Sequence, residues 1–224
     1  MKKEKVGLIL TGGYIESVFL QEFLLTHDVL WVIAVDKGLM SAYELSLPVD
    51  MIVGDFDSVD GKVLASYQNG QIDRIPEIIY LQPEKDMTDT QVAIEQGMKH
   101  FTWHEEIVIL GATGTRLDHV LSNINLLMIP VYHHVKICIL DKNNKIYLAK
   151  EGFTLIKSNC FGNYVSFLPF TERVTGLTLQ GFKYPLQEHT LTQGNSLGVS
   201  NEIVGEKASV SLTSGILIVI ESKD

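Results

Sequence analysis

Three short segments in the first 120 residues bring aspartates together with glycine, hydroxyl or basic residues. They are Gly54–Ser58, Lys85–Thr90 and Gly111–His119. Each lies where a short apolar run gives way to a loop or a helix-like stretch, and the carboxyl ends of parallel strands meet at one edge of an open sheet. Clustered carboxylates repel one another unless a cation joins them, and Mg²⁺ takes oxygen ligands together with substrate phosphates. The segments therefore indicate phosphoryl or pyrophosphoryl chemistry on a nucleotide.

The first segment, Gly54–Ser58, is called the aspartate loop below. Asp55 and Asp57 are two residues apart, so in an extended chain their side chains share a face, while Phe56 points the other way and anchors the loop in the core. Gly54 permits a close backbone approach. Two short carboxylates on such a turn suit a metal ion, whereas the alternative is an Asx-rich turn with no ligand.

In the second segment, Asp86 and Asp89 flank the expected start of a helix. Acidic residues in a first turn stabilise a helix by about 0.3–1 kcal/mol through its dipole, and this structural role is favoured for Asp89. Lys85 either neutralises Asp86 or reaches a phosphate. Thr88 has capping-box spacing to Gln91, which predicts that the helix begins there.

The third segment combines a glycine-containing loop with hydroxyl groups and a cation. Backbone N–H groups at the following helix start, with the hydroxyls of Thr113 and Thr115, form a plausible anion seat. Arg116 is expected in the first helical turn, where the dipole disfavours a cation unless an anion lies between them. Its planar fork also matches phosphate oxygens, so the segment predicts a phosphate contact.

Asp118 and His119, which follow Arg116, each fit two roles. Asp118 stands three residues after Thr115, so helix capping competes with catalysis. His119 is either a ligand contact or a helix histidine with internal partners. Asn123 falls one turn further along the same side of the helix.

Apolar patterns predict the elements that hold these segments. Short continuous apolar runs predict strands covered on both faces, at 6–10, 31–35, 51–53, 78–81 and 107–110. Helical stretches are expected at 15–25, after Gly38, after Thr88 and after Arg116, the last ended by Pro130. An apolar stripe that includes Leu117 and Leu121 predicts a packing face for this last helix.

From about Lys136 the pattern changes to closely spaced strands separated by turn residues. These runs are 137–140, 145–149, 154–157, 164–168, 174–179, 208–212 and 216–220. Such spacing is typical of an antiparallel sandwich or barrel. The sequence therefore predicts an α/β domain with a parallel sheet over residues 1–145, followed by a smaller antiparallel β-sandwich domain over residues 146–224.

The net charge of the chain argues against a nucleic-acid partner. The net charge is −9, and the first 149 residues carry most of it, with 12 basic against 20 acidic side chains. Such a chain has no electrostatic reason to bind a nucleic-acid backbone, and it would need a metal ion to meet a polyphosphate. Cys138 and Cys160 lack metal or redox spacing and are expected to be reduced core thiols. No apolar run is long enough for a signal peptide or a membrane span, so a soluble, cytoplasmic protein is expected.

Other nucleotide and hydrolase signatures are missing, including the P-loop and the dinucleotide fingerprint. The combined pattern, however, resembles that of the thiamine pyrophosphokinase family over nearly the whole chain. The resemblance is carried by Asp36-x-Gly38, the aspartate loop, Lys85-Asp86-x-Thr88-Asp89, Gly114-x-Arg116-x-Asp118-His119 with Asn123, and Ser200-Asn201. It implies an α/β catalytic domain that binds ATP and Mg²⁺, and a β-sandwich domain for thiamine binding and dimerisation. The implied reaction moves pyrophosphate from ATP to the thiamine hydroxyl and releases AMP.

By the same resemblance, Asp55, Asp57 and Asp86 would hold the metal, and Arg116 and Asp118 would complete the catalytic group. The wider set of expected substrate and cofactor contacts is Asp36, Lys37, Lys85, Thr88, Asp89, Thr113, Thr115, Arg116, His119, Asn123, Ser200 and Asn201. The last two belong to the thiamine end. Thiamine would lie at the interface of a homodimer, between one subunit's catalytic domain and the other's β domain.

Two departures from the family pattern stand out. Lys37 replaces a second small glycine, and it either adds a phosphate contact or restricts backbone approach. Both tryptophans fall in the first domain, so Phe161, Phe182 or Tyr184 would have to pack on the thiamine ring. Two other functions compete: a Mg²⁺-dependent phosphatase of the haloacid-dehalogenase type, with Asp55 as nucleophile, and a non-catalytic nucleotide or thiamine sensor.

Overall fold

The computed structural model describes residues 3–82, 84, 86–100 and 105–224. The chain divides into two compact units, Met1–Lys142 and Asn143–Asp224. The predicted division falls after residue 145. None of the helices formed by the described residues has the length and apolar character that a membrane span requires.

Parallel strands form the centre of the first unit, in the order β4-β3-β2-β1-β5-β6. Their bounds are β1 (Glu4–Leu10), β2 (His27–Val35), β3 (Met51–Gly54), β4 (Glu77–Tyr80), β5 (Glu106–Leu110) and β6 (Lys136–Leu140). The chain runs outward from β1 to β4 and then returns to β5 on the other side of β1. This reversal makes the carboxyl ends of β1 and β5 the expected place for a ligand.

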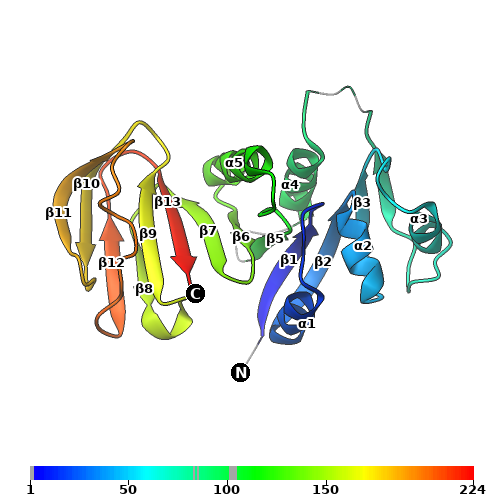
Figure 1. Ribbon diagram of the computed structural model, residues 1–224, viewed down its shortest axis with the longest axis horizontal. Helices are drawn as coiled ribbons and strands as arrows, with labels where there is room; N and C mark the ends of the chain where they lie inside the picture. The colour runs from blue at the N-terminus through cyan, green and yellow to red at the C-terminus, as the bar shows by residue number, and fades with distance from the viewer. Residues whose placement is uncertain (1–2, 83, 85, 101–104) are drawn as a thin grey trace. The chain divides into compact units, whose positions relative to one another are not determined.

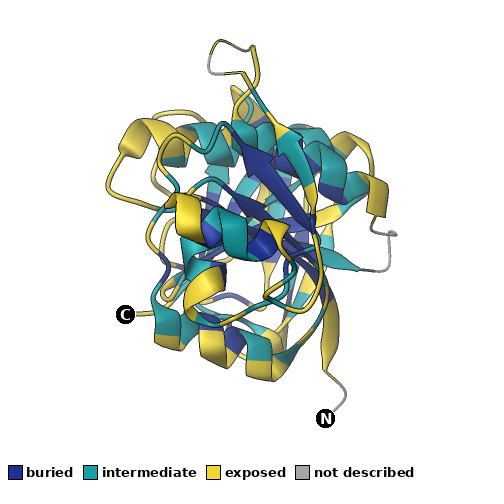
Figure 2. Cartoon of the chain, turned by 90° about the vertical axis from the view of Figure 1, so that its right-hand side faces the viewer, coloured by how far each residue is buried: buried dark blue, intermediate teal, exposed yellow. Residues whose placement is uncertain are grey.

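Helices cover both faces of this sheet (Figure 1). They are α1 (Ser17–Thr26), α2 (Gly38–Glu44), α3 (Gly61–Gln68), α4 (Asp89–His100), α5 (Leu117–Leu126) and α6 (Met128–Tyr132). Right-handed crossovers place α1 to α3 on one face and α4 and α5 on the other. The middle strands are accordingly buried, whereas the helices turn exposed residues outward (Figure 2).

The first unit departs from the sequence-based expectation in four ways. Helix α3 was not predicted, although Asp60 caps it by accepting a hydrogen bond from the Lys62 N–H. Pro130 does not end the preceding helix; α5 ends at Leu126, and Pro130 lies in the first turn of α6, where its missing N–H is tolerated. Leu117 and Leu121 are 73% and 63% exposed, so the predicted packing face is wrong at these two positions. Strand β4 lies at the sheet edge and is half exposed, because one of its sides has no neighbour.

The second unit is built from antiparallel strands. Strand β13 (Leu217–Ser222) pairs with β7 (Asn144–Ala149) and with β9 (Tyr164–Pro169). A four-stranded sheet has the order β11-β10-β12-β8. Its strands are β8 (Phe153–Ile156), β10 (Arg173–Gln180), β11 (Leu186–Thr192) and β12 (Lys207–Ser211). The predicted runs omitted β11.

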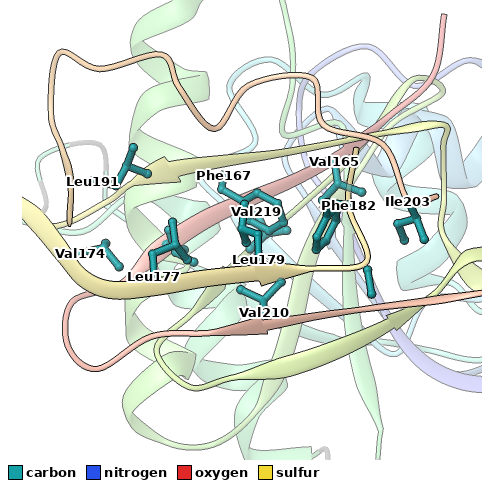
Figure 3. Packing of buried hydrophobic residues seen from close by; sticks show 12 residues of the cluster. Val165, Phe167, Val174, Leu177, Leu179, Phe182, Leu191, Ile203, Val210 and Val219 are labelled. Atoms are coloured by element: carbon teal, nitrogen blue, oxygen red, sulfur yellow. The ribbon is translucent and has the colours of Figure 1, made fainter. Parts of the chain in front are cut away.

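Side chains from β9 and β13 interdigitate with side chains from β10, β11 and β12, as Figure 3 shows. Phe167 and Phe182 meet edge to face at the centre of this cluster, with ring centroids 5.3 Å apart. The second unit therefore has a sandwich core of its own. Both cysteines are free, as expected: Cys138 is buried in β6, and Cys160 is partly buried and packs against the sandwich core.

Candidate active site

The aspartate loop directly follows the buried strand β3 and is closed by one of its own side chains. The Asp57 N–H donates to Asp55 Oδ1 at 3.2 Å, which is an Asx turn. Phe56 between them has a positive φ of 62°, and its carbonyl accepts a hydrogen bond from the Val59 N–H at 3.2 Å. Asp55 is half-buried and Asp57 is exposed, so both carboxylates are open to a ligand at the carboxyl end of β3.

Asp36, at the end of the neighbouring strand β2, packs against the start of this loop. A β-carbon on Gly54 would collide with the Asp36 carboxylate, so glycine is required there for this close approach. Asp36 itself has a φ of 45°, and its N–H donates to the Val53 carbonyl at 3.1 Å. The structure thus brings Asp36 and the aspartate loop together, although they are far apart in the sequence.

Lys37 follows Asp36 and begins α2 with an ordinary helical conformation, at φ −60° and ψ −17°. Its position therefore does not require glycine. Its side chain is exposed, and its β-carbon lies 3.7 Å from a β-carbon built on Gly12. Lys37 is thus available at the same edge of the sheet, beside the loop that follows β1.

The loops after β1 and β5 pack back to back at the point where the strand order reverses. The Gly13 N–H donates to the Gly111 carbonyl at 3.1 Å, and a β-carbon on Gly13 would collide with that carbonyl. Thr11 donates twice to the Leu110 carbonyl, from its N–H at 2.9 Å and from Oγ1 at 3.0 Å. Sequence reasoning did not predict the contacts of Thr11 and Gly13 with the end of β5 and the loop after it. The available signal was small residues directly after the first buried strand.

Arg116 lies just before α5 and pairs with Asp118. Its Nη2 and Nε donate to the two carboxylate oxygens at 2.6 and 3.2 Å. Both side chains are exposed, and hydrogen bonding to Arg116 holds the pKa of Asp118 below its ordinary value. The N-cap residue Arg116 makes no side-chain capping bond, and the Asp118 carboxylate is engaged with Arg116 and with the backbone of His119. An exposed cation with a replaceable partner can turn toward an arriving anion.

The other predicted residues of this segment lie around the same helix start. Thr113 is half-buried, while Thr115 and His119 are exposed. Asn123 donates from Nδ2 to the Ala112 carbonyl at 2.9 Å, which ties α5 to the loop before it. Asn123 therefore supports the loop through its amide group.

At the start of α4, the Thr88 hydroxyl accepts a hydrogen bond from the Gln91 N–H at 3.2 Å. The Gln91 side chain turns to Glu95 instead of completing a capping box. Asp89 is the first residue of the helix and is half-buried, and Asp86 is exposed. Lys85 lies outside the described residues.

No three or more aspartate, glutamate, histidine or cysteine side chains are gathered as a ready-made metal centre within the described ranges. Asp55 and Asp57 nevertheless offer two oxygen donors on one turn, beside Asp36. Mg²⁺ is usually held by one or two carboxylates, with phosphates and water completing its shell. These residues therefore suit an ion that arrives with a polyphosphate.

In the second unit, Asn201 is buried, and both its amide oxygen and its amide nitrogen are hydrogen-bonded. Its Oδ1 accepts from the N–H groups of Tyr184 and Glu202, both at 3.0 Å, and its Nδ2 donates to the Tyr184 carbonyl at 2.8 Å. The adjacent Ser200 is exposed, and its N–H donates to Ser166 Oγ at 3.0 Å. Asn201 thus fixes the backbone of Tyr184.

The three aromatic residues expected to pack on the thiamine ring differ in how far their rings are exposed. Phe182 is 4% exposed in the sandwich core, and the Phe161 ring is covered by Lys223 Nζ, 4.4 Å from its centroid. Tyr184 is 56% exposed and held by Asn201. Lys183 Nζ lies 5.7 Å from the Tyr184 ring centroid, so Tyr184 differs from the other two rings mainly by its greater exposure.

An open parallel sheet with glycine-rich loops at its switch point and an aspartate loop after β3, followed by a β-sandwich, is consistent with a two-part α/β protein that handles phosphates. Family models agree with this division. The model for the thiamin pyrophosphokinase catalytic domain matches residues 24–139, and the model for the thiamin pyrophosphokinase vitamin B1 binding domain matches residues 153–217. The chain belongs to the thiamine pyrophosphokinase family.

Individual relatives support the same conclusion. The chain is 38% identical over 197 residues to thiamine pyrophosphokinase of Bacillus subtilis, covering 87% of this chain and 88% of the relative. A crystal structure of the Bacillus subtilis enzyme matches with a TM-score of 0.84 at 32% identity, covering 99% of this chain and 100% of that one. The structure from Geobacillus thermodenitrificans matches with a TM-score of 0.81 at 30% identity, over 98% of each chain.

This membership gives the chain its reaction: it transfers pyrophosphate from ATP to the hydroxyl of thiamine, giving thiamine diphosphate and AMP. The phosphatase alternative is disfavoured, because the haloacid-dehalogenase pattern needs its aspartate after the first core strand and Asp55 follows β3. The sensor alternative is disfavoured by the match to a catalytic domain.

Proposed function

We propose that the carboxyl-terminal edge of the first unit's sheet binds ATP with Mg²⁺, that Asp55 and Asp57 hold the ion, and that Asp86 joins them when the ion and ATP bind. The observation that carries this proposal is the turn of the aspartate loop, which presents Asp55 and Asp57 at the carboxyl end of β3, with Asp36 packed against Gly54. When bound, the ion supplies charge compensation to the phosphates. Asp36 stays beside Gly54 and limits where the aspartate loop can move.

Cationic and hydroxyl groups around the switch point complete the proposed phosphate site. Arg116 exchanges part of its contact with Asp118 for phosphate oxygens, and Thr113 and Thr115 donate their hydroxyls. Further proposed contacts are Lys37, Lys85, Thr88, Asp89 and His119, with Asn123 holding the loop through Ala112.

In the proposed mechanism, the thiamine hydroxyl oxygen attacks the β-phosphorus of ATP. The bond from that phosphorus to the oxygen shared with the α-phosphate breaks, and AMP leaves with that oxygen. An aspartate of the aspartate loop takes the hydroxyl proton. Because loose phosphoryl-transfer transition states depend mainly on positioning and charge compensation, this proton transfer contributes less than the placement of the phosphates.

The second unit supplies the thiamine end of the proposed site. Ser200 contacts thiamine directly, Tyr184 packs on one of its rings, and Asn201 acts by fixing Tyr184. The matches to separate catalytic and vitamin B1 binding domains support a site that needs both units. We further propose a homodimer in which one subunit's first unit faces the other's second unit, and a cytoplasmic location.

The reaction is tested with purified protein, ATP, Mg²⁺ and thiamine, resolving AMP from ADP and thiamine diphosphate from thiamine monophosphate. AMP and thiamine diphosphate in equal amounts support the proposed attack. ADP with thiamine monophosphate would mean that the γ-phosphorus is attacked instead. Replacing Mg²⁺ by Ca²⁺, which prefers longer and more numerous bonds to oxygen, is expected to lower turnover strongly.

The shared site is tested by mixing Asp55→Asn with Tyr184→Ala under conditions that exchange subunits, at a thiamine concentration so far below KM that neither variant alone shows turnover. If each site combines the first unit of one subunit with the second unit of its partner, half of the dimers are mixed and one site in each is intact, so about a quarter of wild-type activity returns. If each site is built from a single chain, every site keeps one defect and no activity returns.

A further inference from the structure

Phe56 holds an unusual backbone conformation at the centre of the aspartate loop. Its φ is 62°, in the left-handed region that a bulky residue rarely adopts. Such a conformation persists only where surrounding contacts hold it. Because Phe56 joins Asp55 to Asp57, its backbone angles set the directions of both carboxylates. The contacts that hold Phe56 therefore bear on how the two aspartates are presented.

The contacts come from the neighbouring edge strand. The rings of Phe56 and Tyr80 meet edge to face, with centroids 5.3 Å apart and planes at 89°. Tyr80 is the register partner of Gly54, and the Leu81 N–H donates to the Gly54 carbonyl at 2.9 Å. The aspartate loop is thus joined to β4 by backbone at its first residue and by a ring contact at its third.

The Tyr80 ring is itself held by a residue of helix α3. Gln68, the last residue of α3, donates from Nε2 to the Tyr80 hydroxyl at 2.9 Å. Tyr80 is 63% exposed, so burial alone does not fix its orientation. The hydrogen bond at one end of the ring and Phe56 at the other leave it little freedom to rotate.

We propose that Tyr80 and Gln68 are positioning residues for Asp55 and Asp57: Gln68 orients the Tyr80 ring, the ring holds Phe56 in its left-handed conformation, and Phe56 presents the two carboxylates. This inference rests on the proposed function, in which these carboxylates hold Mg²⁺. Residues that orient metal ligands without touching the metal contribute about 10–100-fold to affinity or activity.

The first readout is independent of activity. Hydrogen–deuterium exchange of the metal-free protein reports on the amides of Asp57 and Val59, which hydrogen-bond within the loop. Tyr80→Ala is expected to speed exchange in the peptide covering residues 54–60, and Tyr80→Phe and Gln68→Ala are expected to do so by a smaller, equal amount. The double variant Tyr80→Phe/Gln68→Ala should match either single one, because each already removes the same hydrogen bond.

The second readout is the Mg²⁺ concentration at half-maximal turnover. Tyr80→Ala is expected to raise it roughly tenfold, with the KM for thiamine unchanged. The matched control is Tyr132→Ala on α6, a tyrosine that is 62% exposed, which should alter neither readout. Equal changes in the KM for thiamine and in Mg²⁺ dependence would indicate general loosening and overturn the proposal.

Unchanged exchange in the 54–60 peptide of Tyr80→Ala would overturn the proposal regardless of activity, as would additive effects in the double variant. If the wild-type protein formed no thiamine diphosphate while Tyr80→Ala still loosened the loop, the proposed function would fail, and the positioning of the loop by Tyr80 would stand.

Discussion

The residues expected at the site are polar in both units, but they differ in exposure. In the first unit, Asp57, Arg116 and Asp118 are exposed in segments that directly follow buried strands. In the second unit, Asn201 is 2% and Glu221 is 5% exposed. Every polar group of the Asn201 side chain is hydrogen-bonded to backbone, and Glu221 accepts from the Tyr147 hydroxyl and from the Phe161 N–H.

This difference separates residues that meet a substrate from residues that build the frame. An exposed carboxylate on a short loop can change partners at little cost, so its loss affects chemistry before stability. A buried amide with several backbone partners leaves unsatisfied groups behind when it is removed, so its loss affects stability first. Substitutions in the two units should therefore give different balances between turnover and free energy of unfolding.

The largest effect on turnover is expected at the aspartate loop. Asp55→Asn removes a charge from the proposed ion site, and we expect kcat to fall about 10³-fold, equivalent to ~4 kcal/mol in the activation free energy. The thermal unfolding midpoint should stay within a few degrees of wild type, because the side chain is not in the core. Steady-state kinetics at saturating Mg²⁺, with calorimetry, measure both quantities.

The matched control is Asp73→Asn, an exposed aspartate of the same unit with a φ of 63°. Asparagine tolerates this conformation, so both turnover and stability should be unchanged. Near-normal turnover of Asp55→Asn would remove Asp55 from the proposed ion site.

A smaller loss of turnover is expected at Arg116. Arg116→Ala should lower kcat/KM for ATP about 10²-fold, because a cation that offsets developing phosphate charge is removed. Arg173→Ala is the control: Arg173 is 63% exposed and pairs with the exposed Glu172 at 3.0 Å, like the Arg116 pair but in the other unit. A comparable loss in both variants would mean that Arg116 contributes only general surface charge.

Asp118→Asn distinguishes the two roles left for Asp118. If Asp118 only occupies Arg116, the variant should lower the KM for ATP several-fold; if it takes part in the chemistry, kcat should fall. Because hydrogen bonding to Arg116 depresses the pKa of Asp118, the carboxylate is fully ionised above its ordinary pKa, and the pair is lost only on acidification below it. The effect of Asp118→Asn should therefore be constant between about pH 6 and pH 8.

The sequence predicted those features of the fold and of the site that depend on neighbouring residues. Continuous apolar runs predicted β1, β3 and β5, because buried parallel strands leave that pattern in neighbouring residues. The aspartate loop was also predicted, because its residues are consecutive in the sequence. Its Asx turn was also open to prediction, because the bond from the Asp57 N–H to Asp55 spans two residues.

Features that depend on distant partners were missed. The pairing of Gly13 with Gly111 exists only because β5 returns beside β1, which no local pattern encodes. The apolar stripe at Leu117 and Leu121 predicted packing, yet periodicity says only that a face is apolar, and the fold leaves these two side chains exposed. The role of Asn201 depends on Tyr184, seventeen residues earlier.

In the second unit, Asn201→Ala is expected to affect stability more than turnover, the reverse of what is expected for Asp55→Asn in the first unit. It leaves backbone groups of Tyr184 and Glu202 without their partner, so the free energy of unfolding should fall by ~1–3 kcal/mol. With Tyr184 loosened, the KM for thiamine should rise several-fold at nearly unchanged kcat. Asn195→Ala, which removes an exposed side chain that accepts from the Leu197 N–H, is the control and should cost less. A large fall in kcat with full stability would place Asn201 in the chemistry.

The smallest effect on turnover is expected at Cys160. This residue should instead make the stability of the second unit depend on pH. Burial, together with the nearby Glu221 carboxylate, raises the pKa of the Cys160 thiol to about 11. Both causes disfavour the thiolate, so the folded protein keeps this proton to higher pH than the unfolded chain does. The stabilisation from this thiol is complete below the ordinary pKa of 9.0 and is lost as pH rises toward about 11.

Alkylation of native Cys160 by iodoacetamide at pH 8 should be about 10²-fold slower than that of the unfolded chain, because only the thiolate reacts. Cys160→Ser should keep wild-type turnover and remove the stability loss between those pH values, whereas rapid alkylation at pH 8 would show that Glu221 and Cys160 are not held together in the folded protein.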